Sequence, residues 1–171
     1  MANKVSFSNQ ELSFKDIQNY HSTLTKALLE FYKSATDVCF VGYTSTEMRQ
    51  ELEGRLSELD KSSCLSLFAS IEALLRINYL QRCEQKRKDT ISRKMREIYL
   101  SKANKASLED DILEIWKQEP CLTSIASQIK AAFKYRHWLA HGRYWTPKFG
   151  RKYDFDYLYT LGSEIVDQCE L

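Results

Sequence analysis

The scarcity of the two residues that punctuate turns is the feature that most limits the folds open to this chain. Only 5 Gly and 2 Pro occur among its 171 residues. Folds rich in strands need many tight turns, and such turns draw heavily on Gly and Pro. We therefore predict an all-α fold, and the length suits one domain with a hydrophobic core better than two.

Apolar residues recur at helical spacing along most of the chain, which supports the same conclusion. The periodicity predicts helices over residues 14–34, 62–85, 91–99, 123–141 and 154–169, and a further helix that starts after a possible cap at Ser45 or Thr46 and runs to about 59. The segment 62–85 is apolar nearly all round, so we expect it at the centre of a bundle, packed against 123–141.

The remaining segments are predicted to connect these helices. Residues 1–13 are expected to form a loose arm, and the apolar, β-prone segment 36–43 a strand-like connector or a buried link. Ser107–Asp110 has a capping-box pattern, which opens a short helix that Pro120 ends. Gly142 is a natural stop for the helix before it.

The cysteines and the hydropathy pattern bear on the compartment. The five cysteines are far apart, odd in number and without a C-x-x-C pair, so neither a disulfide framework nor a zinc site is indicated. The first fourteen residues lack the apolar region of a secretory signal, and no apolar run reads as long enough to span a bilayer. We expect a cytoplasmic protein with reduced thiols and no membrane partner.

Positive charge is concentrated in one stretch, although the formal net charge is only +2. Between Pro120 and Tyr153 there is no Asp or Glu, and the seven basic residues are Lys130, Lys134, Arg136, Arg143, Lys148, Arg151 and Lys152. Such a stretch suits a phosphate-bearing partner, but it also fits a solvated basic face. The run 86–88 is interpreted as solvated.

Two of the three histidines are four residues apart on a predicted helix. His137 and His141 therefore share a face, but no carboxylate is near in sequence and the surroundings are cationic, so no metal site is expected. Arg136 and His141 point about 140° apart around the helix, so a second copy about a twofold axis is needed to aim both at one atom. A histidine that moves protons and an arginine that stabilises developing charge suit phosphodiester chemistry.

The segment from Arg136 to Gly142 (RHWLAHG) resembles the R-x4–6-H signature of the HEPN superfamily. The helix from Leu67 to Arg76 also resembles the first core helix of that family, which often carries a buried acidic residue, here Glu72. The charged middle and the helix 108–116 fit as well. The resemblance covers about residues 62–142, and it does not place the first sixty.

We expect a single helical domain over residues 1–171, with the N-terminal helices that the periodicity predicts in 1–60, the family-like core in 62–142, and a basic loop and C-terminal helix in 143–171. The resemblance implies a homodimer that cleaves RNA at a shared site without metal or other cofactor. The catalytic pair would be Arg136 and His141, with His137 as the polar residue after the Arg and Glu72 as the supporting acid.

The resemblance also suggests a biological setting. Such domains often serve as toxins or in phage defence, with an antitoxin or sensor protein as partner. Aromatic residues beside cations can stack on unpaired bases, or they can belong to the core or a dimer interface. The candidate substrate-binding residues are Lys134, Arg143, Tyr144 and Trp145.

Other interpretations of the same residues stay open. The domain could be a non-catalytic HEPN-like module that binds RNA, a nucleotide or a protein. Arg136 could pair with Glu72 without any chemistry, and Glu72 could simply satisfy Arg76 one turn away. His137 could orient its neighbours or contact a dimer partner, and His21 is expected to be structural.

Overall fold

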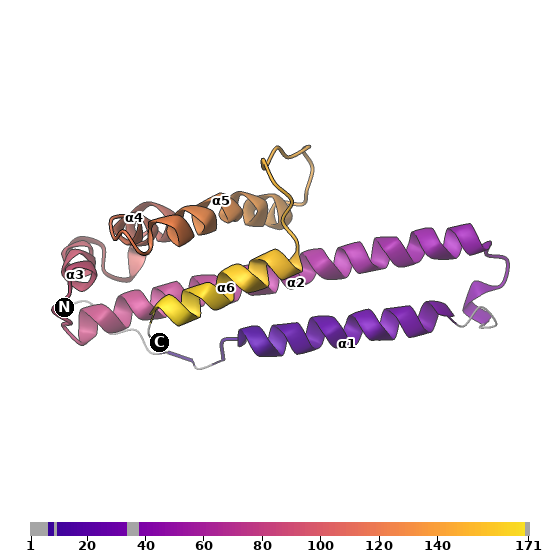
Figure 1. The fold of residues 1–171 in the computed structure, drawn as a ribbon, viewed down its shortest axis with the longest axis horizontal. Helices are drawn as coiled ribbons and strands as arrows, with labels where there is room; N and C mark the ends of the chain where they lie inside the picture. Colours follow the sequence, from indigo (N-terminus) through magenta and orange to yellow (C-terminus); the bar gives the residue numbers. More distant parts are fainter. Residues whose placement is uncertain (1–6, 9, 34–37, 170–171) are drawn as a thin grey trace.

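A computed structural model describes residues 7, 8, 10–33 and 38–169, and all of the regular structure in those ranges is helical, with no strand. The prediction of an all-α fold is confirmed. The main helices are α1 (Phe14–Lys33), α2 (Ser45–Glu84), α3 (Thr90–Lys102), α4 (Leu113–Lys117), α5 (Thr123–Ala140) and α6 (Phe155–Cys169). Figure 1 shows α2 running the length of the molecule, with α1 along one side and α5 and α6 along others.

Helix α2 is one continuous helix of 40 residues. The prediction of two helices, ending near residue 59 and restarting at 62, is wrong. The serines at the expected break bond backward within the helix: Ser62 Oγ donates to the Leu59 carbonyl at 2.9 Å, and Ser66 Oγ to the Ser62 carbonyl at 3.4 Å. A serine can therefore satisfy its hydroxyl inside a helix without starting a new one.

The start of α2 has a complete capping box, one or two residues earlier than predicted. Thr44 is the N-cap in place of Ser45 or Thr46, and its hydroxyl accepts from the Glu47 N–H at 3.2 Å. In return, the Glu47 carboxylate accepts from the Thr44 N–H at 2.8 Å, and this bond lowers the pKa of Glu47. The box satisfies two backbone donors that a helix end otherwise leaves unpaired.

The connector before α2 is not strand-like where it is described. Residues 36 and 37 of the predicted segment lie outside the described ranges, and Val38–Phe40 form a single 3-10 turn, η1. Gly42 then adopts a φ of +87°, which takes the chain around to Thr44. Phe40 is buried near Phe31 and Tyr32, so apolar character here serves a local aromatic cluster and no sheet.

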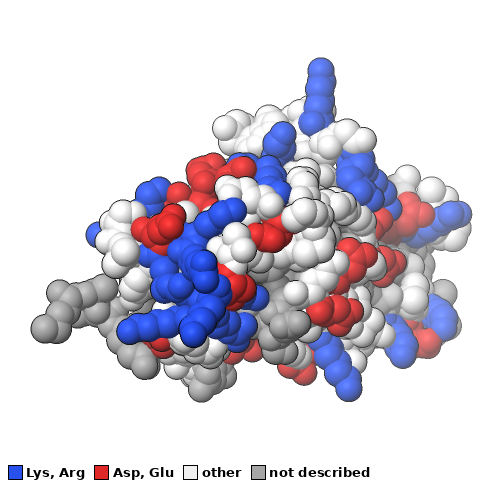
Figure 2. Space-filling view, turned by 60° about the vertical axis from the view of Figure 1, so that its left-hand side comes forward, with Lys and Arg blue, Asp and Glu red and all other residues white. Residues whose placement is uncertain are grey.

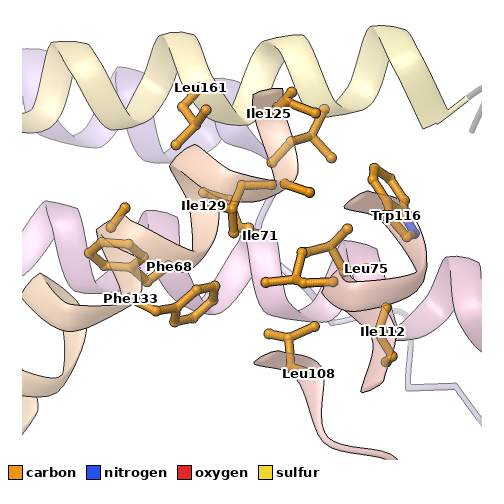
Figure 3. Packing of buried hydrophobic residues seen from close by; sticks show 14 of the residues in the cluster. Phe68, Ile71, Leu75, Leu108, Ile112, Trp116, Ile125, Ile129, Phe133 and Leu161 are labelled. Carbon is orange, nitrogen blue, oxygen red and sulfur yellow. The ribbon is translucent and has the colours of Figure 1, made fainter. Parts of the chain in front are cut away.

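The core lies where α2, α5 and α6 meet. Figure 3 shows Phe68, Ile71 and Leu75 of α2 packed beside Ile129 and Phe133 of α5. The rings of Phe68 and Phe133 have centroids 5.6 Å apart. The predicted central pairing of segments 62–85 and 123–141 is confirmed, and it fixes how the motif-bearing end of α5 faces α2.

Helix α1 docks on α2 and α6 through small, specific contacts. The Phe14 ring lies so close to Gly162 of α6 that a Cβ there would stand 2.5 Å from it. His21 stacks on Phe155 at 4.0 Å, and its Nδ1 lies 3.0 Å from the hydroxyl of buried Ser63, which supports a structural role for His21. Of the predicted arm, residues 1–6 and 9 lie outside the described ranges, and the Leu12 carbonyl accepts from Ser70.

Helix α2 contains an 18-residue window with a mean hydropathy of 1.2, enough for a membrane span by length and composition. The expectation that no run reaches that length therefore does not hold for α2. Within the fold, 56% of that window is buried. A central bundle helix, which is apolar on most sides because other helices surround it, shows the same pattern.

The continuity of α2 can be tested by proline at its middle. Ser62 is exposed, so Ser62→Pro acts mainly on the backbone, and in a helix interior it should lower the free energy of unfolding by about 3 kcal/mol or more. Ser62→Ala is the matched control and should change it by less than about 0.5 kcal/mol. Urea unfolding followed by circular dichroism measures both. Equal stability of the two variants would show that a helix starts at this point, where proline is tolerated.

Candidate functional site

The RHWLAHG segment forms the last turns of α5 and its cap. The helix ends at Ala140, His141 is the C-cap, and Gly142 adopts a φ of +79°. The Arg143 N–H then donates to the Trp138 carbonyl at 3.1 Å, which is the closing bond of a Schellman motif. The predicted stop at Gly142 is confirmed, and it leaves His141 exposed at the helix end.

Arg136 lies beside Glu72 of α2, as one of the sequence interpretations expected. The Arg136 Nη2 is 3.3 Å from Glu72 Oε2, while Arg76 Nε is 2.9 Å from Glu72 Oε1. Arg76 also donates to the Ala106 carbonyl at 3.1 Å. One carboxylate thus holds two guanidinium groups. The side chains of Arg136 and Glu72 are 38% and 27% exposed, so this pair is reached by solvent and is not a sealed salt bridge.

A small cavity of about 190 Å³ opens beside this network. Its lining combines the three charged residues above with Glu109 and parts of the neighbouring turn and core, namely Ser107, Leu108 and Phe133. A cavity of this size has room for a small polar group and not for a whole nucleotide with its base. A larger ligand would have to lie across the surface and reach in with one group.

His137 contacts Glu109, a residue that the sequence analysis had assigned only to a helix cap. The His137 Nε2 is 3.0 Å from Glu109 Oε1. Glu109 stands in a π-helical turn, η3 (Leu108–Ile112), capped by the Ser107 hydroxyl, which accepts from the Asp110 N–H. No sequence signal linked the two residues, because 28 positions separate them and only the packing of η3 brings them together.

His141 stands apart from the Arg136 cavity, as the spacing around the helix predicted. Its ring is nearly parallel to that of His137, with centroids 6.1 Å apart and an angle of 11° between the planes. It is not among the residues that line the cavity beside Arg136. Two imidazoles and a guanidinium therefore lie at one helix end. In the described part of a single chain, however, the side chains of Arg136 and His141 do not converge on one point.

The candidate substrate-binding residues differ in how free they are. Arg143 is engaged, since both of its terminal nitrogens contact the Glu58 carboxylate at 2.6 and 2.9 Å, and this pairing lowers the pKa of Glu58. Lys134 and Tyr144 are exposed. Trp145 is 39% exposed, and its carbonyl accepts from the Trp138 indole at 2.8 Å. An aromatic surface thus lies directly after His141.

Acidic residues from other elements reduce the positive charge of the 120–153 stretch. Four of its seven basic residues form ion pairs, namely Lys130 with Glu114 and Asp110, Arg136 with Glu72, Arg143 with Glu58, and Lys152 with Asp154. Arg151 lies over the Tyr157 ring at 3.6 Å. The local positive field is therefore weaker than the sequence stretch alone indicates.

The described residues hold no grouped set of metal ligands, and their two buried thiols have raised pKa values. Nowhere in residues 7, 8, 10–33 and 38–169 do three His, Cys, Asp or Glu side chains gather as a metal site would require. Burial raises the pKa of Cys83 to about 11, and burial beside Asp60 raises the pKa of Cys64 further still. A thiol that stays protonated at neutral pH is a poor nucleophile.

No family model, no curated protein and no solved structure matches this chain. The resemblance to the HEPN superfamily therefore depends on the residues of the sequence alone.

A double-mutant cycle on Glu72 and Arg136 can separate a structural ion pair from a functional one. Because both side chains are partly exposed, the coupling between Glu72→Gln and Arg136→Gln should be about 1 kcal/mol or less in unfolding free energy. The single variant Glu72→Gln and the double variant both lose the contact between Glu72 and Arg76. That loss therefore cancels in the coupling energy. A coupling of about 3 kcal/mol or more is typical of a buried pair and would make the pair chiefly structural.

Proposed function

We propose that this chain is a HEPN-type, metal-independent endoribonuclease. The observation that carries the proposal is the end of α5, where a solvent-reached guanidinium (Arg136) and two nearly parallel imidazoles (His137 and His141) lie within two helical turns. Acid–base groups beside a fixed cation suit transfer of a phosphodiester bond. A cytoplasmic toxin or phage-defence role, with an antitoxin or sensor protein as partner, belongs to the same proposal.

In the proposed reaction the 2′-hydroxyl of RNA attacks the adjacent phosphorus. The 2′-oxygen–phosphorus bond forms and the bond from phosphorus to the 5′-oxygen breaks, which leaves a 2′,3′-cyclic phosphate and a 5′-hydroxyl. His141 takes or gives one of the two protons that must move. Arg136 binds the non-bridging oxygens as their negative charge grows, a task for which the planar guanidinium fork is well shaped.

Glu72 and Glu109 support these groups without touching the phosphate. Glu72 holds Arg136 through one oxygen and Arg76 through the other, which limits the orientations of the Arg136 guanidinium. When Nε2 of His137 carries a proton, it can donate to the Glu109 carboxylate. In a neutral ring Nδ1 is then the nitrogen that can accept a proton. Both carboxylates act as positioning residues.

The divergence of Arg136 and His141 favours a site completed by a second copy. A twofold dimer that brings two α5 ends together supplies Arg136 from one protomer and His141 from its partner. Exposed Tyr144 and half-exposed Trp145 come soon after His141 in the chain, and they offer apolar surface for that contact or for a base.

A non-catalytic module is the second candidate, and two observations favour it. Arg136 is already held by Glu72, and the cavity beside it measures only about 190 Å³. In a binding module the same network would hold α2 and α5 together, and the exposed cations and aromatics would contact RNA, a nucleotide or a protein.

The two candidates differ in whether His141 is needed for cleavage. We expect the purified protein to cut single-stranded RNA in EDTA and to leave 2′-deoxy substrates intact. His141→Ala should reduce the rate by about 10²–10⁴-fold, since it removes an acid–base group. Arg136→Lys should also be strongly impaired because an ammonium lacks the guanidinium fork. Fluorescent-substrate cleavage measures the rates, and Thr146→Ala, at an exposed position nearby, is the control.

Stability must be measured alongside activity in these variants. His141 is exposed, so His141→Ala should leave the unfolding midpoint close to that of the unaltered protein. Absence of RNA cleavage under all conditions, together with unfolding of His141→Ala, would make the histidine structural and favour the binding module.

A shared site can be tested by mixing two inactive variants. Arg136→Ala and His141→Ala should each be inactive alone. In a mixed dimer one of the two shared sites keeps both Arg136 and His141. Because about half of the dimers in an equimolar mixture are mixed, the mixture should regain about a quarter of the full activity. Light scattering reports the dimer. A monomer that cleaves RNA, or a mixture that stays inactive although heterodimers form, contradicts sharing.

A further inference from the structure

A positive surface of the described chain lies away from the α5 motif, where α2 is followed by α3. Residues 85–105 contain eight basic and two acidic residues. Figure 2 shows Lys and Arg side chains gathered on the face that this end of the molecule presents. We define the α2–α3 basic surface by Lys86, Arg87, Lys88, Arg93, Lys94 and Arg96.

These six cations have no carboxylate partner among the ion pairs of the described residues. The acidic residue within the turn, Asp89, is occupied elsewhere. Its Oδ1 accepts from the Ser92 N–H as the N-cap of α3, and it pairs with Arg82 at 3.2 Å. Asp89 is therefore taken up by Arg82 and the α3 cap, and it forms no ion pair with Lys86, Arg87 or Lys88.

The turn that presents these cations is rigidly built. Arg82 is only 12% exposed, and its guanidinium binds Asn78 at 2.8 Å and Ser92 at 3.2 Å, both of which are buried. Arg96 donates to the Arg87 carbonyl at 2.5 Å, which ties α3 to the turn. A preorganised cationic surface loses less conformational freedom on binding than a flexible tail does.

The basic surface is connected to the candidate site along α2. Arg76 belongs to the network around Glu72, and eight residues of helix separate it from Glu84, the end of α2, which corresponds to about 12 Å; Lys86 follows two positions later. The small cavity beside Arg136 holds only a small group. A nucleic-acid strand that is cut there must therefore be held by its flanking phosphates at other cations.

We propose that the α2–α3 basic surface is a docking surface for the phosphate backbone of single-stranded RNA that extends from the candidate site. The identity of the polyanion depends on the proposed ribonuclease function. Lysine and arginine that neutralise phosphates release counterions from the strand, which makes the affinity depend on salt. The contacts are to phosphates, so this surface contributes affinity and no base sequence preference.

Salt-dependent binding of a labelled single-stranded RNA to the His141→Ala protein tests the proposal without cleavage. The test variant carries Lys86→Asn, Arg87→Gln and Lys88→Gln, where Asn suits the φ of +53° at position 86. Fluorescence anisotropy should show weaker binding, and the slope of log affinity against log salt should become shallower by about 0.7 for each lost phosphate contact, or about 2 in total.

A control of equal charge separates a local effect from a general one. Lys15→Gln, Lys26→Gln and Arg49→Gln remove three exposed positive charges from α1 and the start of α2. This control should keep the slope of the unaltered surface, and circular dichroism should show all variants folded. Equal slopes for the test variant and the control, or the absence of salt-dependent RNA binding, would overturn the proposal and favour an acidic protein partner.

The proposed function and the docking surface can fail separately. If RNA binds through the basic surface but no RNA is ever cut, the surface stands and the ribonuclease proposal fails. If RNA is cut and the test variant binds and cuts as the control does, the ribonuclease stands and the docking surface is wrong.

Discussion

The burial of α2 on several sides at once is the interaction on which the rest of the structure depends. Leu67, Ile71 and Leu75 have essentially no exposed surface, and full burial of such a side chain stabilises the fold by about 1.5–3 kcal/mol. A helix that is apolar nearly all round needs neighbours on every side, and α1, α3, α5 and α6 all contact it. The position of α5 against α2 in turn places Arg136 beside Glu72, so the candidate site is a consequence of core packing.

The same packing redistributes charge between sequence neighbours and spatial neighbours. The 120–153 stretch has no acidic residue of its own, yet packing supplies Glu58 and Glu72 from α2 and Glu109 from η3. In contrast, the 85–105 stretch contains acidic residues but keeps six cations without a carboxylate partner, because Asp89 is used by Arg82 and the α3 cap. The sequence alone therefore overstates the positive charge of the surface formed by residues 120–153 and understates that of the surface formed by residues 85–105.

The extent to which this fold could be predicted depends on the range of the forces involved. Helical periodicity and the Gly142 stop are local, and most of the helices and the end of α5 lie within a few residues of the prediction. The break expected in α2 was an error of the same local reasoning, since a serine can either cap a helix or bond back into one. The contact of Glu109 with His137 could not be predicted, because it spans 28 positions and needs the π-helical turn.

By itself the sequence determined that the chain is helical, that one apolar helix is central, and that Arg136 and His141 diverge around their helix. These properties arise from residue spacing and turn chemistry, which act over one or two helical turns. Only the tertiary structure decided which acids meet which bases, namely that Glu72 binds Arg136, that Glu109 binds His137, and that the cations of the α2–α3 basic surface have no carboxylate partner among the described residues. Electrostatic pairing depends on distance in space, and a folded helical bundle sets that distance independently of separation along the chain.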